Sequence, residues 1–190
     1  MVTLTSVTLT SLWMPILIST VIAFAAGSLM HVLIKHHRND FKAAPDEASA
    51  LQALSALGLA PGDYFIPHPT QSHQSSAPSV IIMTVMRPGG IKLGSSLFQW
   101  TVYQLIITIL CAYVASRTLP VAAPYLNVFR VVGTVGFMAY SVAYAHESIW
   151  WQRSWGIMLR YMFDGLVYAL LTAGVFGWLW PRLSCAPTKC

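Results

Sequence analysis

LWMPILISTVIAFAAGSLMHVLI, residues 12–34, contains no Asp, Glu, Lys or Arg and is long enough to cross a lipid bilayer as one helix. About 20 mainly apolar residues are needed for such a crossing. Three further segments meet this requirement, at residues 97–115, 125–144 and 158–180. Together they predict an all-α membrane protein built as a bundle of four transmembrane helices.

The composition agrees with this fold class. Of the 190 residues, 56% are apolar and 9% are charged, and the mean hydropathy is +0.61. A soluble domain carries about a quarter charged residues, and a disordered chain combines low hydrophobicity with high charge, so both classes are excluded. The net charge of +5 reflects a shortage of acidic residues, six against eleven Lys and Arg. No basic cluster with interleaved aromatic residues is present, so the expected partner is the lipid bilayer and not nucleic acid.

The distribution of Lys and Arg predicts the orientation of the spans. Seven of these residues lie in or flank the connections after the first and third spans, and four lie in or flank the second connection and the tail. Because basic residues favour the cytoplasmic side, residues 35–96 are expected in the cytoplasm and both termini outside. No basic residue precedes the first span and its apolar stretch is long, so it is predicted to be a retained span and not a signal peptide.

Four regions follow from these spans: an N-terminal transmembrane helix in 1–34, an insert in 35–96, a three-helix transmembrane region in 97–181 and a tail in 182–190. The insert is too long for a bare connection between two helices. It is therefore expected to contain secondary structure of its own.

Local signals in the insert predict a small α+β unit. A short amphipathic helix is expected at 46–57, with Asp46 as the N-cap and Gly58 as the stop signal. Strands are expected near 64–66 and at 80–86. Because a helix and two strands bury little surface, the insert is expected to lie against the inner ends of the spans or against a partner.

Small residues recur every four positions in two of the spans. Such ridges let helix backbones approach closely where lipid supplies no hydrophobic drive. They favour tight packing within one bundle over homodimerisation, and Gly133 and Gly136 in the third span add to this packing. The predicted packing residues are Ser19, Ala23, Gly27, Gly165, Ala169, Ala173 and Gly177.

Ionisable residues gather near the cytoplasmic ends of the predicted spans: His31, His146, Glu147, Arg160 and Asp164. Ionisable residues in or beside spans usually face the bundle, which predicts a proton relay, a cation site or a substrate contact. The alternative is structural, with ion pairs such as Arg160 and Asp164, one turn apart, fixing the helix ends. The structural role is favoured because charge costs less near the span ends than at mid-bilayer.

The remaining histidines lie in predicted loops. His36 and His37 follow the first span, and His68 and His73 lie in a proline-containing stretch of the insert. A metal site needs three or four converging ligands, and the chain has no HExxH pattern or comparable spacing. No metal is expected, and these histidines are interpreted as solvated.

The three cysteines suggest one redox hypothesis. Cys111 lies within the second span and is interpreted as inert packing. Cys185 and Cys190 fall in the tail, on the predicted oxidising side, and are a candidate disulfide. A quinone-linked thiol oxidoreductase similar to the membrane disulfide oxidases is therefore one hypothesis, although the chain has no CxxC pair.

Two stretches carry recognisable patterns. LGLAPGDYFIP at 57–67 contains GLxPGxYxxP, and FDGLVYALLTAGVFGWLWP at 163–181 contains FDGLxYxLxTAGxFGWLWP, preceded by Ile149, Trp150 and Trp155. Both patterns resemble a family of small four-span bacterial inner-membrane proteins. The resemblance implies an inner-membrane location; that family has no assigned activity, so the resemblance implies no catalytic residue.

Three functional hypotheses fit these features. The favoured one is a non-enzymatic accessory or scaffolding subunit, partnered by another membrane protein or by copies of itself, because no nucleotide-binding loop, GxSxG or HExxH motif is present. The second is a small carrier or channel that uses the polar cluster. The third is the quinone-linked thiol oxidoreductase. The sequence names no cofactor and no catalytic residue.

Overall fold

A computed structural model describes residues 7–34, 36–68, 70 and 80–182 of the chain. The chain divides into two compact units. The helical unit comprises the residues up to Arg38 and those from Ser95 onward, and the insert unit comprises Asn39–Gly94. The insert unit differs from the predicted insert, 35–96, by a few residues at each end.

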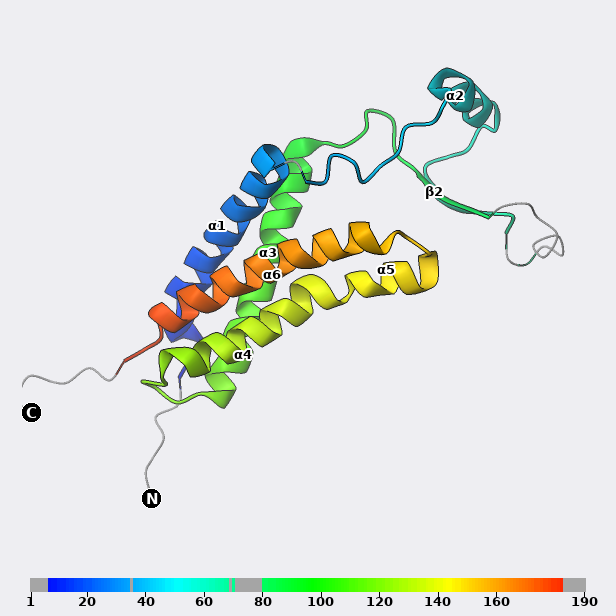
Figure 1. Cartoon of the computed structure of the whole chain (residues 1–190). Coiled ribbons are helices and arrows are strands. Elements are labelled where there is room, and N and C mark those ends of the chain that lie inside the picture. Colours follow the sequence, from blue (N-terminus) through cyan, green and yellow to red (C-terminus); the bar gives the residue numbers. More distant parts are fainter. Residues whose placement is uncertain (1–6, 35, 69, 71–79, 183–190) are drawn as a thin grey trace, which may run out of the picture. The chain divides into compact units, whose positions relative to one another are not determined.

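In the described part of the chain, four helices are long and apolar enough to cross a membrane, as predicted (Figure 1). The first, Leu9–Ile34, begins with the short helix η1 (Leu9–Leu12) and continues as α1 (Trp13–Leu29). It ends in a π-helical turn, η2 (Met30–Ile34). The second is α3 (Leu93–Thr118).

The third spanning helix also contains a π-helical turn. It covers Tyr125–Trp151 and consists of α4 (Tyr125–Phe137), the π-helical turn η4 (Met138–Val142) and α5 (Tyr144–Trp151). The fourth is α6 (Trp155–Trp178). Successive spanning helices run in opposite directions, so the start of α1 and the end of α6 lie at the same end of the helical unit (Figure 1).

The third and fourth helices extend further toward their connection than the apolar pattern predicts. The third was expected to end at residue 144 but continues through polar residues to Trp151, where Gln152 adopts a left-handed conformation with φ 52°. The fourth begins at Trp155 and not at residue 158. Hydropathy detects apolar side chains, whereas a helix requires only its backbone hydrogen bonds. A hydropathy pattern therefore does not predict helix ends that consist of polar residues.

α6 is the central helix of the unit and packs most closely against α4 and α1. On the α4 side, a Cβ atom built on Gly136 would lie 3.3 Å from Ala169, and one on Gly133 would lie 3.4 Å from Ala173. A side chain on Gly165 would collide with the Ser141 hydroxyl group and the Tyr140 backbone. The predicted ridge of small residues on α6 therefore lies at a contact within the chain.

The small residues of α1 also face the interior. Ser19 and Ala23 are buried, and a side chain on Gly27 would collide with the Trp100 ring of α3. Nearer the start of α1, the hydroxyl groups of Thr20 and Thr108 form a hydrogen bond of 2.9 Å between α1 and α3. Close approach of the backbones and polar contacts between helices thus hold the unit together.

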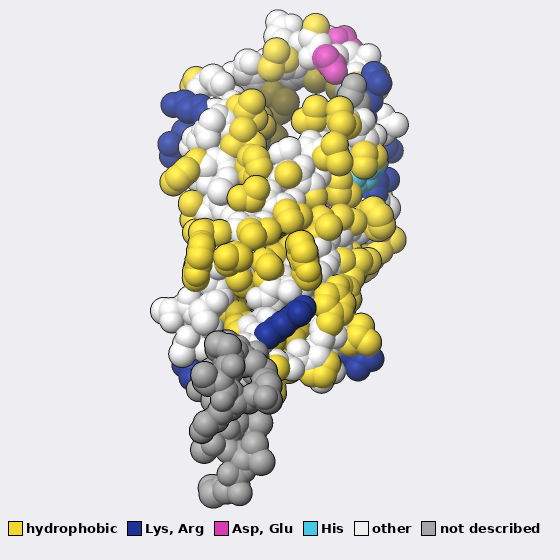
Figure 2. All heavy atoms as spheres, turned by 90° about the vertical axis from the view of Figure 1, so that its left-hand side faces the viewer, with side chains coloured by type: hydrophobic (Ala, Val, Ile, Leu, Met, Phe, Trp, Pro, Cys, Tyr) yellow, Lys and Arg dark blue, Asp and Glu magenta, His cyan; other side chains and the backbone are white. Residues whose placement is uncertain are grey.

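Large apolar side chains cover the outside of the spanning helices. Hydrophobic side chains occupy most of the middle of the helical unit on the face drawn in Figure 2. Val21 of α1 is 66% exposed and Leu110 of α3 is 50% exposed. An outer surface of this kind is stable against lipid tails and unfavourable in water.

The insert unit begins with the short helix α2 (Glu47–Ala56), close to the predicted range. Asp46 is its N-cap, and its carboxylate accepts a hydrogen bond of 3.0 Å from the backbone N–H of Ser49. Hydrogen bonding from Ser49 lowers the pKa of Asp46. The helix buries none of its residues, and Leu51, Leu54 and the C-cap residue Leu57 form an exposed apolar face.

Two strands complete the insert unit. β1 (Gly62–Ile66) pairs antiparallel with β2 (Ile81–Val85), and the register joins Tyr64 to Met83. Both strands lie where short strands are predicted, with β1 starting two residues earlier. His68 follows β1 and contacts the Thr70 hydroxyl group at 2.8 Å, whereas His73 lies outside the described residues.

The packing around Gly165 generates a stability prediction. We expect Gly165→Ala to lower the melting temperature of the full chain in detergent, because overpacking of this kind costs about 1–3 kcal/mol. Gly174→Ala in the same helix is the matched control, since its added Cβ would lie 3.8 Å from the nearest atom, an ordinary contact. Alanine at that site should be neutral or stabilise the helix by up to about 1 kcal/mol. Equal melting temperatures for the two variants would contradict the observed packing.

Candidate functional site

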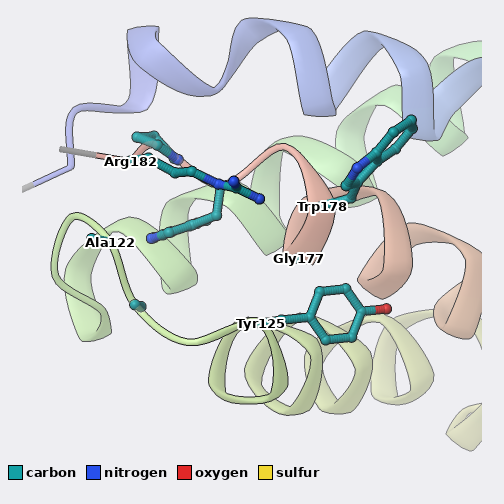
Figure 3. Close-up of a pocket in the computed structure, with 8 residues that line it drawn as sticks. Ala122, Tyr125, Gly177, Trp178 and Arg182 are labelled. Carbon is teal, nitrogen blue, oxygen red and sulfur yellow. The ribbon is translucent and has the colours of Figure 1, made fainter. Parts of the chain in front are cut away.

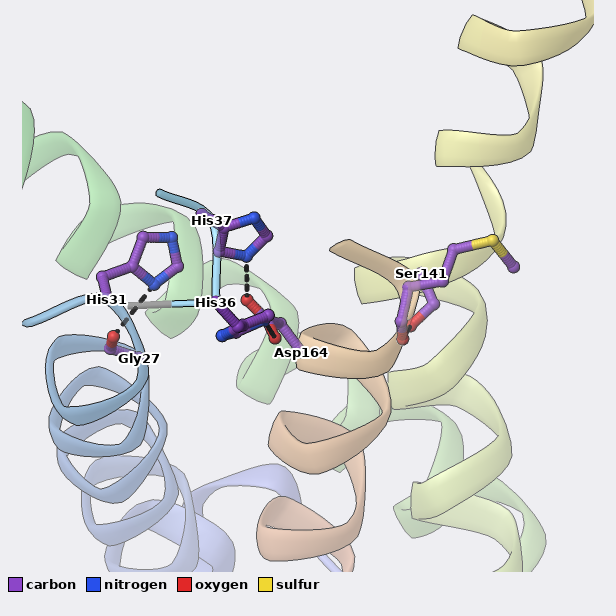
Figure 4. A network of polar contacts seen from close by, with 7 residues as sticks. Gly27, His31, His36, His37, Ser141 and Asp164 are labelled. Atoms are coloured by element: carbon purple, nitrogen blue, oxygen red, sulfur yellow. Dashed lines mark hydrogen bonds and ion pairs between the residues drawn. The ribbon is translucent and has the colours of Figure 1, made fainter. Parts of the chain in front are cut away.

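The Asp164 carboxylate lies inside the helical unit and is held by two histidines (Figure 4). Its side chain on α6 is only 4% exposed. Oδ1 accepts a hydrogen bond of 2.8 Å from Nε2 of His36, and Oδ2 accepts one of 2.8 Å from Nε2 of His37. The two histidine side chains are 21% and 13% exposed. Both carboxylate oxygens are therefore satisfied by side chains that follow α1 in the chain.

A third histidine lies beside this pair. The His31 ring centroid is 5.0 Å from that of His37, and Nδ1 of His31 lies 3.1 Å from the carbonyl oxygen of Gly27 (Figure 4). One ligating atom each from His31, His37 and Asp164 lie within 4.8 Å of one another. We call His31, His36, His37 and Asp164 the histidine–aspartate cluster.

Aromatic rings fix the orientation of His37. Its ring stacks on Tyr161 of α6 at 4.4 Å and 28°, and Tyr161 stacks on Tyr144 of α5 at 5.2 Å and 22°. The His36 ring lies 4.1 Å from that of His37. The cluster thus joins the end of the first spanning helix to the third and fourth.

Both π-helical turns adjoin the cluster. η2 contains His31, and in η4 the Ser141 hydroxyl group donates a hydrogen bond of 3.0 Å to the Met162 carbonyl of α6, two residues before Asp164. Such turns are rare and frequently occur at functional sites.

Buried polar side chains continue from the cluster into the unit. Asp164, Tyr168 and Thr172 follow one another at four-residue spacing on α6, and each is less than 10% exposed. α1 and α3 also each contribute a buried side chain with a polar atom that no described residue satisfies. These side chains are Ser19 and Gln104, whereas the Tyr140 hydroxyl group contacts the Thr172 side chain.

The structure brings together only part of the predicted polar cluster. His31 and Asp164 belong to it, and Arg160 lies one turn before Asp164 on α6. Glu147 instead lies 3.7 Å from Arg153 in a pair that is about 40% exposed, and the His146 ring lies 6.2 Å from that of Trp150. His146 and Glu147, which the sequence groups with Asp164, therefore have other neighbours in the structure, because the third helix continues past them to Trp151.

The interpretation of His36 and His37 as solvated loop residues was wrong. They lie directly after the first span, where the chain turns and brings both rings onto α6. Hydrophobic periodicity carries no information on such a turn. The available signal was chemical: an aspartate inside a span needs partners, and adjacent histidines at the end of another span can supply them.

A cavity at the opposite end of α6 is the other recess of note (Figure 3). It has a volume of about 390 Å³ and a mainly apolar lining with one charged side chain, Arg182. The lining of the cavity contains no acid or histidine. It consists of Ala122, Ala123, Tyr125, Gly177, Trp178, Trp180, Pro181 and Arg182. The indole N–H of Trp180 donates a hydrogen bond of 3.0 Å to the Pro120 carbonyl.

The cysteines contribute no reactive site within the described residues. Cys111 is fully buried, and its sulfur lies 3.9 Å from the Val132 carbonyl oxygen, consistent with packing. Cys185 and Cys190, the candidate disulfide, lie outside the described residues.

Compared with models of protein families, with curated proteins and with solved structures, the chain has no match. The resemblance to a family of small inner-membrane proteins therefore stays a prediction. The functional argument depends on the geometry of the histidine–aspartate cluster.

The cluster predicts a graded effect of substitutions at Asp164. Asp164→Leu should destabilise the full chain by about 1–3 kcal/mol for each histidine that loses its acceptor. Asp164→Asn should cost less, because the amide can accept from one histidine and donate to the other after a change of tautomer. Unfolding by heat in one detergent measures both.

Glu147→Gln is the matched control for charge removal. Its exposed pair with Arg153 should contribute at most about 1 kcal/mol. An Asp164→Leu variant as stable as Glu147→Gln would show that the two histidine contacts contribute nothing.

Proposed function

We propose that the protein is a small multi-pass carrier for a cation, with Asp164 at its binding site. The observation that carries this proposal is an almost completely buried carboxylate inside a spanning helix, contacted by two histidines at 2.8 Å. An aspartate at the centre of a spanning helix costs about 2.5–3.5 kcal/mol on insertion scales. The small uncharged residues of the same helix are sufficient for close packing, so packing does not require an aspartate at position 164. Binding of a positively charged ligand gives a reason for it.

The depth of Asp164 supports binding within the membrane. It lies nine residues after Trp155 in the 24-residue helix α6. At 1.5 Å per residue this is about 14 Å from the start of a helix about 36 Å long. Because α6 begins three residues before the predicted span, Asp164 lies further from the helix end than the sequence predicts. The low cost of charge near a span end therefore supports a purely structural role for Asp164 less strongly than the sequence suggests.

The surroundings of Asp164 favour a carrier over an open channel. The row of Asp164, Tyr168 and Thr172 is polar, but the next position at the same spacing is Phe176, which is 0% exposed. Leu12 and Val128 are also fully buried in this apolar core. A polar row that ends in packed apolar side chains requires a conformational change before a cation can pass.

The proposed location is the bacterial inner membrane, with both termini outside and residues 35–96 in the cytoplasm. The support is the excess of Lys and Arg in the first and third connections. On this topology the four spanning helices form the membrane bundle, and the cluster opens toward the cytoplasmic side.

Ion-jump currents on the purified protein in proteoliposomes test the carrier. Jumps of H⁺, Na⁺, K⁺, Mg²⁺ and Zn²⁺ should give a current for at least one cation in the wild type, because the buried carboxylate attracts positive charge. Asp164→Asn should lower that current at least tenfold. Glu147→Gln should leave it unchanged, since Glu147 lies outside the cluster. Absence of current for every cation, or an unchanged current in Asp164→Asn, would refute the carrier.

The accessory subunit is a second candidate, supported by a different observation. α2 presents Leu51, Leu54 and Leu57 on one exposed face, between 47% and 67% exposed, and buries none of its residues. An apolar face of this kind fits a partner protein at the membrane surface. The thiol oxidoreductase has no comparable support among the described residues and stays a hypothesis from the sequence.

Native mass spectrometry of the chain, extracted gently from its own membrane, tests the accessory role. We expect a second protein at fixed stoichiometry, and its loss when Leu51 and Leu54 are both changed to Glu, because charge disrupts an apolar contact. Gln52→Glu adds charge to the opposite side of α2 and should retain the partner. A wild-type chain that carries no second protein would exclude this candidate.

A further inference from the structure

We infer that His31, His37 and Asp164 bind a divalent first-row transition metal of the Zn²⁺ class, with His36 as a supporting residue. The inference rests on the proposed cation site at Asp164 and names the class of cation. It starts from three candidate ligands, two imidazoles and one carboxylate, that the chain brings together from two separate segments: the end of the first spanning helix with the residues just after it, and α6.

The spacing of the ligands suits one metal ion. The candidate ligating atoms of the three residues lie within 4.8 Å of one another. Tetrahedral ligands about 2.0–2.2 Å from Zn²⁺ lie roughly 3.3–3.6 Å apart. Completing the site therefore needs side-chain rotations that separate Nε2 of His37 from Oδ2 of Asp164, now 2.8 Å apart, and that bring any more distant pair together by up to about 1.5 Å.

The donor set selects the class of metal. Two imidazoles and one carboxylate suit Zn²⁺, Co²⁺, Ni²⁺ and Fe²⁺, which accept nitrogen ligands. Mg²⁺ and Ca²⁺ prefer shells of oxygen ligands, and this cluster supplies oxygen only from Asp164. A transition metal is therefore the cation that fits these side chains best.

The tautomer of His31 is set for metal binding. A carbonyl oxygen only accepts hydrogen bonds, so the 3.1 Å contact with Gly27 means that Nδ1 of His31 carries the hydrogen. Nε2 then presents its lone pair. Metal-binding histidines commonly donate their other ring N–H to a backbone carbonyl or a carboxylate in this way.

His36 acts on the site through Asp164. It donates Nε2–H to Oδ1, whereas His37 contacts Oδ2. A hydrogen bond to the second oxygen of a ligating carboxylate orients that carboxylate and is a usual supporting contact at metal sites. His36 is thus a positioning residue and not a ligand.

Loading and release are compatible with the surroundings. Asp164 is buried, but His31 is exposed, so the cluster has one ligand in reach of an incoming ion. For the metal to bind at Nε2 of His37, the hydrogen now donated to Asp164 moves to Nδ1 of the ring or to water. Three protein ligands leave a coordination position for water, which suits an ion that must exchange.

Cobalt binding to the purified full-length chain in detergent tests the inference. Co²⁺ reports its coordination by visible absorption, and Zn²⁺ should displace it. We expect saturable binding of one ion per chain. His31→Ala and His37→Ala should each weaken binding at least tenfold, and His36→Ala should weaken it by about 10- to 100-fold. His146→Ala, in the same unit but outside the cluster, is the matched control and should bind as the wild type does.

The inference and the carrier can fail separately. Absence of saturable Co²⁺ and Zn²⁺ binding, or binding that His31→Ala and His37→Ala leave unchanged, would overturn the metal site even if Asp164→Asn abolishes a current for another cation. Metal binding that depends on both histidines supports the site even if no cation produces a current, in which case the carrier fails. His31 is exposed, so a folding defect is not expected in His31→Ala, which keeps the test decisive.

Discussion

The two hydrogen bonds on the Asp164 carboxylate connect the parts of the helical unit. A carboxylate in an apolar interior is costly unless its oxygens are hydrogen-bonded, because no water is present to solvate it. Here the donors come from His36 and His37, which lie beyond the end of the first spanning helix. The chain must therefore turn back at that point. The position of His31, its contact with His37 and the stacking on Tyr161 follow from this requirement.

The packing of α6 and the cluster depend on each other through adjacent residues. Gly165 follows Asp164 and has no room for a side chain against Ser141 and Tyr140. The close approach of η4 that Gly165 permits excludes lipid and water from that side of Asp164. Without this approach the carboxylate would be more exposed and would not require two histidine partners. The ridge of small residues on α6 thus contributes to the site as well as to stability.

The sequence was sufficient for the elements that depend on local composition. Four apolar segments, the ridge from Gly165 to Gly177 and the Asp46 cap are visible in it because each depends on residues close together in the chain. The cluster depends on a long-range contact between His36 or His37 and Asp164, more than 120 residues apart. Periodicity cannot encode that contact, so His146 and Glu147 were grouped with Asp164 from their expected depth alone. The helix that continues to Trp151 removes the basis for that grouping.

Several buried polar atoms of the interior have no hydrogen-bond partner among the described residues, which supports the proposed cation site. Most buried polar atoms in folded proteins find a partner, since each unsatisfied group costs about 1–3 kcal/mol. Nδ1 of His36 and both polar atoms of the Gln104 side chain are buried without a hydrogen-bond partner among the described residues. Ser19 adds a further group of the same kind in α1. Apolar residues of similar size would remove this cost, so stability alone does not explain these side chains. These atoms come from different segments, the end of the first spanning helix, α1 and α3, and they could gain a partner only from water or an ion that enters the interior, as the proposed carrier requires.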